Sequence, residues 1–125
     1  MEKQTLKPFG AELEERCLKF ALDVARFCRS LKKDYILLEY CIQLIRAASS
    51  VGANYIEANE SLSRKDFLNR AKICRKEAKE SRYWLRLINP SLSDKTQLDE
   101  CNRLIQEAKE LMLIFNSMVN KQKVF

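Results

Sequence analysis

Apolar residues recur at alternating spacings of three and four in four separate stretches of the chain. The first stretch begins with Leu13, Cys17 and Phe20, and the third begins with Phe67 and Ala71. The fourth stretch consists of Leu98, Cys101, Ile105, Ala108, Met112, Phe115 and Val119. Residues at this spacing share one face of an α-helix that packs at the shallow angles of a coiled coil. Each stretch therefore predicts one amphipathic helix, and the expected ranges are 9–32, 36–59, 64–89 and 94–121.

Glycine and proline are scarce, since the 125 residues include 2 Gly and 2 Pro. A multistranded sheet would need such residues at most of its turns. The 46% of hydrophobic residues excludes a disordered chain. Four helices of about 25 residues with short connections predict an all-α, antiparallel, up-down-up-down four-helix bundle, in which residues 1–125 form a single domain.

Three features of the sequence predict a cytoplasmic protein with reduced thiols. The longest uninterrupted apolar run, residues 111–115, is much shorter than the ~18–20 residues that span a bilayer. Residues 1–15 carry both charge signs and lack the apolar region of a secretory signal. The five cysteines are odd in number, scattered and without a CxxC motif, which indicates small residues of the core.

The net charge of +6 comes from one segment of the chain. Residues 64–86 contain nine of the 23 basic residues but only three of the 17 acidic ones, and the remaining sequence has equal numbers of both. At about 100° per residue, eight of the nine cations share an arc of about 120° on the third expected helix, and Tyr83 lies among them. Arg70 alone projects elsewhere, at the margin of the core.

Such a face fits a nucleic-acid backbone, with Lys and Arg on phosphates and Tyr83 on a base. The alternative is a solvated face that acidic residues of the first and fourth helices partly neutralise. The chain contains no zinc finger, RNP motif, GxxG loop or helix-turn-helix spacing, so binding without sequence specificity is expected. The predicted nucleic-acid-binding residues are Arg64, Lys65, Lys72, Arg75, Lys76, Lys79, Arg82, Tyr83 and Arg86.

The second expected helix has a second apolar stripe beside its core stripe. Two adjacent apolar faces exceed what one seam within the chain can bury. Either this helix lies unusually deep in the bundle, or the second stripe contacts another subunit. A glycine inside a helix costs about 1 kcal/mol relative to alanine, so Gly52 indicates a close neighbour. The candidate oligomer interface consists of Leu38, Ile42, Ile45, Ser49, Gly52 and Ile56.

Each expected helix carries two glutamates at i, i+3 spacing, an arrangement that in a bundle raises the possibility of a di-iron site. Such a site also needs two Glu-x-x-His motifs, and the chain has no histidine. The same absence excludes Ser-His and Cys-His nucleophiles, and there is no Gly-rich phosphate loop. The sequence therefore predicts no enzyme activity, no catalytic residue, no metal and no cofactor.

Two runs of sequence resemble a known family. SVGANYIEAN at residues 50–59 and RKDFLNRAKICRKEAKESRYWLRLI at residues 64–88 closely resemble bacterial four-helix-bundle proteins encoded in intervening sequences of 23S ribosomal RNA genes. Those proteins were once filed among ribosomal proteins. The accessory protein of diversity-generating retroelements, which partners a reverse transcriptase, is more distantly similar. The positions that fit the family motif are Asn54, Glu57, Ser63, Phe67, Ala78, Glu80, Ser81 and Trp84.

The resemblance implies a left-handed antiparallel bundle that assembles into a ring, typically a homopentamer, with a basic surface for nucleic acid and no attached enzyme activity. It gives the second apolar stripe a use as a subunit contact, and it implies hydrogen bonds from Asn54 and Glu57 within or between subunits. The resulting hypothesis is a non-catalytic oligomer that binds RNA or DNA, as an accessory to a nucleic-acid enzyme such as a reverse transcriptase. The alternative is a protein scaffold whose basic face docks on an acidic partner.

Overall fold

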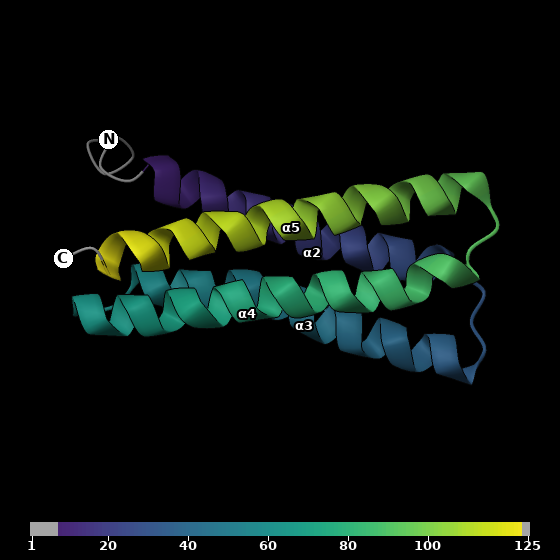
Figure 1. The fold of residues 1–125 in the computed structure, drawn as a ribbon, viewed down its shortest axis with the longest axis horizontal. Helices are drawn as coiled ribbons and strands as arrows, with labels where there is room; N and C mark the ends of the chain where they lie inside the picture. Colours follow the sequence, from purple (N-terminus) through teal and green to yellow (C-terminus); the bar gives the residue numbers. More distant parts are fainter. Residues whose placement is uncertain (1–7, 124–125) are drawn as a thin grey trace.

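The computed structural model describes residues 8–123, and within them the chain forms four long helices. These are α2 (Pro8–Ser30), α3 (Tyr35–Asn59), α4 (Arg64–Ile88) and α5 (Lys95–Lys123), with the short 3-10 helix η1 (Asn89–Ser91) after α4 (Figure 1). The expected ranges differ from these bounds by no more than about two residues at any end, which is the usual uncertainty of helix termini. Part of the segment 1–15, considered above for a secretory signal, lies outside the described residues.

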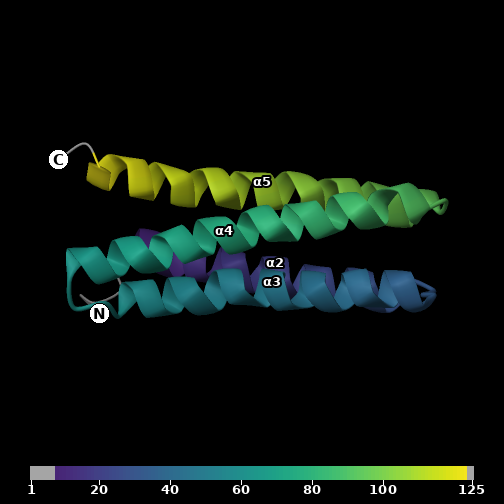
Figure 2. The same cartoon turned by 60° about the horizontal axis from the view of Figure 1, so that its bottom comes forward.

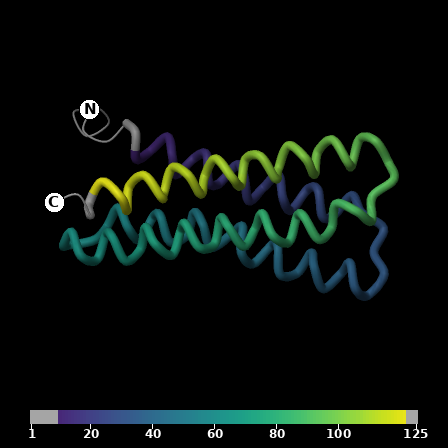
Figure 3. The backbone as a smooth tube through the Cα atoms, in the orientation of Figure 1, coloured from purple at the N-terminus to yellow at the C-terminus, as the bar shows by residue number. Residues whose placement is uncertain are grey.

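Consecutive helices run in opposite directions, as the path of the chain shows (Figures 1 and 3). α4 packs along α3 and α5, and α2 packs along the same two helices from the other side. The view turned by 60° places α4 between α5 and α3 (Figure 2). The predicted all-α four-helix bundle is therefore confirmed, while the left-handed sense of its supercoil stays a prediction.

Polar side chains begin three of the helices. Oδ1 of Asp34 accepts a hydrogen bond from the backbone N–H of Leu37 over 2.8 Å, and Oγ of Ser63 accepts one from Asp66 over 3.1 Å. Asp94 does the same for Gln97 at the start of α5. These bonds satisfy N–H groups that have no partner within the first helical turn.

The core follows the predicted stripes in α2, α3 and α4 but shifts in α5. Leu104 and Leu111 are fully buried, whereas Ile105 and Met112, the expected core positions, are only partly buried. α5 contacts α2 on one side and α4 on the other, so two adjacent stripes of this helix share the burial. All five cysteines are buried and free, which confirms their predicted place in the core.

α3 is the one described helix that is long and apolar enough, by length and composition, to cross a membrane, with a mean hydropathy of 1.2 over 18 residues. The sequence prediction of no such segment rested on uninterrupted apolar runs, and α3 is interrupted by polar residues. A helix that packs in the core of a bundle also meets these criteria of length and composition. In this fold, one face of α3 is buried in the bundle through residues such as Leu44, Ala48 and Val51.

Candidate nucleic-acid interface

The predicted cations lie along the side of α4 that borders α5. Lys72, Lys76 and Lys79 are exposed, while Arg75 and Arg82 are half-buried. Arg64, Lys65 and Arg86 extend the row of exposed cations towards both ends of the helix. This set, Arg64, Lys65, Lys72, Arg75, Lys76, Lys79, Arg82 and Arg86, is called the basic face below.

Tyr83 is 55% exposed on the same arc of α4. Its ring meets that of Trp84 edge-on, with 5.4 Å between the centroids, and Trp84 in turn lies 6.0 Å from the ring of Tyr40 on α3. One edge contact orients the Tyr83 ring and leaves about half of the side chain open to solvent. This arrangement suits a platform on which a base can stack.

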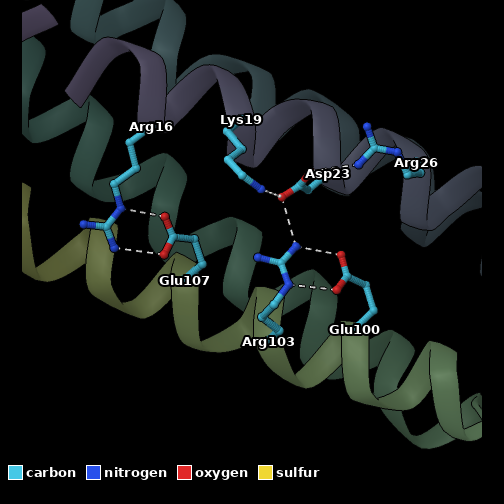
Figure 4. A network of polar contacts seen from close by, with 7 residues as sticks. All are labelled: Arg16, Lys19, Asp23, Arg26, Glu100, Arg103 and Glu107. Carbon is cyan, nitrogen blue, oxygen red and sulfur yellow. Dashed lines mark hydrogen bonds and ion pairs between the residues drawn. The ribbon is translucent and has the colours of Figure 1, made fainter. Parts of the chain in front are cut away.

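Carboxylates of α2 and α5 bind cations of those two helices rather than the basic face. Arg16 binds Glu107 through two hydrogen bonds of 2.7 and 2.9 Å (Figure 4). Nη2 of Arg16 also donates a hydrogen bond to Glu110. Asp23, whose side chain is 7% exposed, accepts hydrogen bonds from Lys19, Arg26 and Arg103 (Figure 4). Arg103 also pairs with Glu100.

The contacts between helices therefore give little support to the alternative, in which acidic residues of α2 and α5 neutralise the basic face. In the part of the chain that the structure describes, no ion pair within 4.0 Å includes Lys72, Lys76 or Lys79. Nε of Arg82 is buried and has no hydrogen-bond partner among the same residues. Like charges at i, i+3 and i, i+4 repel one another, so these cations favour an anion supplied from outside the described chain.

A groove of about 480 Å³ runs between α4 and α5 at the centre of the basic face. Nη1 of Arg75 crosses it and donates a hydrogen bond to Oδ1 of Asn116 over 3.0 Å. Sequence reasoning missed the α5 side of this groove, because Met112 was assigned to the core and Leu113 to an apolar run. The groove is lined by Lys72, Arg75, Lys76, Lys79, Met112, Leu113 and Asn116.

Arg70 is separate from the basic face, as its projection predicted. Its Nη1 donates a 2.9 Å hydrogen bond to Oδ1 of Asn54 on α3, and Nδ2 of Asn54 donates to the backbone oxygen of Ser50. Asn54 therefore joins α3 to α4 within one chain. The side chain of Glu57 is exposed, and no hydrogen bond of its carboxylate is found among residues 8–123.

The second apolar stripe of α3 is not buried within the chain. Leu38, Ile42, Ile45 and Ile56 are 39–49% exposed, so the possibility of an unusually deep helix is wrong. The placement of Gly52 in the candidate oligomer interface also needs correction, because a Cβ built there would lie 3.1 Å from Cβ of Cys17. Its close neighbour is α2 of the same chain and not a second subunit.

Two leucines of α2 that sequence reasoning missed, Leu18 and Leu22, are 50% and 53% exposed. The contact between Gly52 and Cys17 sets the register of the antiparallel pair, and it places these leucines alongside the exposed stripe of α3. Their i, i+4 spacing beside the core stripe of the first helix was the available signal. Leu18, Leu22, Leu38, Ile42, Ile45, Ser49 and Ile56 are together called the α2–α3 patch below.

Within residues 8–123 no group of three or more His, Cys, Asp or Glu side chains is arranged to hold a metal ion. Of the glutamate pairs noted in the sequence, Glu107 and Glu110 bind Arg16. Burial and the neighbouring Glu80 raise the pKa of Glu77.

Comparison with known proteins places the chain in a family. The model of the 23S rRNA-intervening sequence protein family matches residues 11–117. A crystal structure of a protein of unknown function from the S23 ribosomal protein family of Bacteroides thetaiotaomicron VPI-5482 is similar, with a TM-score of 0.76 and 26% sequence identity over 89% of this chain and 97% of that one. No curated protein matches this chain. The family match spans the basic face and most of all four helices, and the chain belongs to the 23S rRNA-intervening sequence protein family.

Proposed function

We propose that this protein is a non-catalytic, oligomeric bundle that binds RNA or DNA through the basic face of α4 without reading sequence. The observation that carries the proposal is the group of exposed lysines, Lys72, Lys76 and Lys79, that no carboxylate among the described residues pairs. Each phosphate that such a cation neutralises releases a counterion, and this release drives binding. A cytoplasmic location with reduced thiols belongs to the same proposal.

The length of the basic face fits an extended anion better than a small one. From Lys65 to Arg86, α4 rises about 30 Å at 1.5 Å per residue. That length corresponds to roughly nine base pairs along a duplex at about 3.4 Å each. A polyanion can follow the whole row of cations, whereas a single phosphate would use only part of it.

Assembly of several copies through the α2–α3 patch completes the proposal. The patch lies where α3 borders α2, and the basic face lies where α4 borders α5, so a contact between copies at the patch leaves the basic face open. A ring, typically a homopentamer in the family that the sequence resembles, would multiply the basic face. Repeated weak phosphate contacts then gain from avidity.

The function is tested by filter binding of RNA and DNA at several salt concentrations. We expect the logarithm of the affinity to fall linearly with the logarithm of salt concentration. The triple change Lys72→Glu, Arg75→Glu and Lys79→Glu should abolish binding. A matched triple variant changes the net charge equally at exposed sites away from α4: Arg29→Glu, Lys32→Glu and Arg46→Glu. This control should retain most of the nucleic-acid binding.

Absence of binding at low salt, or full binding by the α4 triple variant, would contradict the proposal. The former result would favour the alternative, a scaffold whose basic face docks on an acidic protein. The proposal also includes association with a nucleic-acid enzyme such as a reverse transcriptase, which is motivated by the resemblance of the sequence to the accessory protein of diversity-generating retroelements. Co-purification of nucleic acid with the native protein, read from its absorbance ratio, is the simplest first measurement.

A further inference from the structure

The groove between α4 and α5 combines two kinds of surface. One wall carries Lys72, Arg75, Lys76 and Lys79, and the other carries Met112, Leu113 and Asn116 of α5. Leu113 is 49% exposed, so it presents an apolar surface beside four cations. A duplex offers phosphates to such a groove but keeps the flat faces of its bases stacked inside, so no base face is available to cover the leucine. An unpaired nucleotide offers both a phosphate and an apolar base.

Among the residues that the structure describes, no carboxylate lines this groove. Asn116 accepts a hydrogen bond from Nη1 of Arg75 over 3.0 Å, which orients the guanidinium and leaves its remaining N–H groups available to a phosphate. Nδ2 of Asn116 makes no hydrogen bond within residues 8–123 and can donate to a base or a phosphate. The volume of about 480 Å³ lies within the range of roughly 300–1,000 Å³ that is typical of ligand pockets.

We infer that this groove binds an unpaired nucleotide, with the phosphate on the lysines of α4 and the base against Met112 and Leu113, so that the protein prefers single-stranded to double-stranded nucleic acid. The inference rests on the proposed function and specifies its ligand. Tyr83, seven residues beyond Lys76 on the same arc, lies about 10 Å along α4 and offers a platform for another base of the strand.

The test compares three fluorescent ligands of equal length: a single strand, the same strand in a duplex, and a single strand of abasic sites. The abasic strand retains the phosphates and removes the bases, so it isolates the apolar contact. Anisotropy titrations at one fixed salt concentration should show that the protein binds the single strand about three- to tenfold more tightly than either of the other ligands. Because the wall is aliphatic, this range extends somewhat below the effects of about fivefold and more that are measured for a base stacked on an aromatic side chain.

Leu113→Ser should weaken binding of the normal single strand by about three- to tenfold and leave binding of the duplex and the abasic strand unchanged. Ile36→Ser is the matched control, because Ile36 is 48% exposed on α3, away from the groove, and this change should alter none of the three affinities. Unchanged circular dichroism and melting temperature would show that both variants are folded. Since both side chains are about half exposed, we expect this result.

Two failures are distinguishable. Salt-sensitive binding of all three ligands with equal affinity, unaffected by Leu113→Ser, would overturn the inference and leave the proposed function standing. No binding of any ligand at low salt would remove the proposed function, and the inference with it.

Discussion

Nη2 of Arg103 on α5 donates a hydrogen bond to Oδ2 of Asp23 on α2 over 2.9 Å. Asp23 is nearly buried and also binds two cations of its own helix, Lys19 and Arg26 (Figure 4). Together with the pair of Arg16 and Glu107, this contact uses acidic side chains of α2 and α5 at the seam between them. The cations of α4 lie beyond the opposite side of α5 and are left without these partners.

Asp23→Asn should lower the free energy of unfolding at pH 7 by about 1–3 kcal/mol. The change removes the charge that three cations share while the site stays buried. Urea denaturation measures the difference. Asp99→Asn is the control, because the pair of Asp99 and Lys95 is exposed and should contribute less than about 1 kcal/mol.

Asp23 should also make stability dependent on pH. Burial alone would raise the pKa of Asp23, but hydrogen bonds from the three cationic side chains outweigh burial and lower the pKa. Because the pKa is lower in the folded state, the contribution is present above about pH 4 and is lost as the pH falls below it. Asp23→Asn should therefore lose less stability between pH 5 and pH 3 than the wild type. Equal losses would contradict the role of Asp23.

Replacing Gly52 by a larger residue should not stabilise the protein, although Gly52 lies within a helix. Alanine would raise helix propensity by about 1 kcal/mol, but its Cβ would lie 3.1 Å from Cβ of Cys17, an atom fixed to the backbone of α2. We expect Gly52→Ala to give no gain in the free energy of unfolding, and Gly52→Val to lose about 1–3 kcal/mol.

The control for Gly52 is Ala53→Gly at the exposed neighbouring position, which should cost about 1 kcal/mol through propensity alone. If Gly52→Ala instead raised the free energy of unfolding by about 1 kcal/mol, equal and opposite to that cost, Cys17 would not restrict the site. Thermal or urea unfolding of the three variants supplies the comparison.

The helices could be predicted because their core stripes repeat at one spacing, and a repeat such as Phe67, Ala71 and Cys74 depends only on neighbours along one helix. The contact of Asp23 with Arg103 joins residues 80 positions apart, and no spacing within one helix encodes it. The same holds for the groove, because Leu113 becomes part of it only when α5 packs beside α4. The cations themselves were predictable, since one helix carries all of them.

The cysteines should be unreactive in the native protein. Burial raises the pKa of the Cys17 and Cys74 thiols to about 12. A hydrogen bond with the Cys28 thiol lowers the pKa of Cys41, but all five thiols are buried and therefore inaccessible to a reagent. Since the thiolate is the nucleophile, we expect no rapid reaction with a disulfide reagent at pH 8, and reaction of all five after denaturation. Leu62→Cys, at a position that is 98% exposed, should add one fast thiol. A fast native thiol in the wild type would contradict the packing.

Assembly through the α2–α3 patch predicts that the wild type sediments well above its monomer mass of 14.7 kDa. Ile42→Glu, Ile56→Glu and Leu22→Glu should each shift the protein towards the monomer, because every change places a charge in an apolar contact between copies. These side chains are at least 41% exposed in the single chain, so the monomers should keep their helical circular dichroism. Ile36→Glu, equally exposed on α3 but outside the patch, should leave the mass unchanged. A wild type at 14.7 kDa would remove the oligomer from the proposal, whereas dissociation by Ile42→Glu but not by Leu22→Glu would restrict the interface to α3.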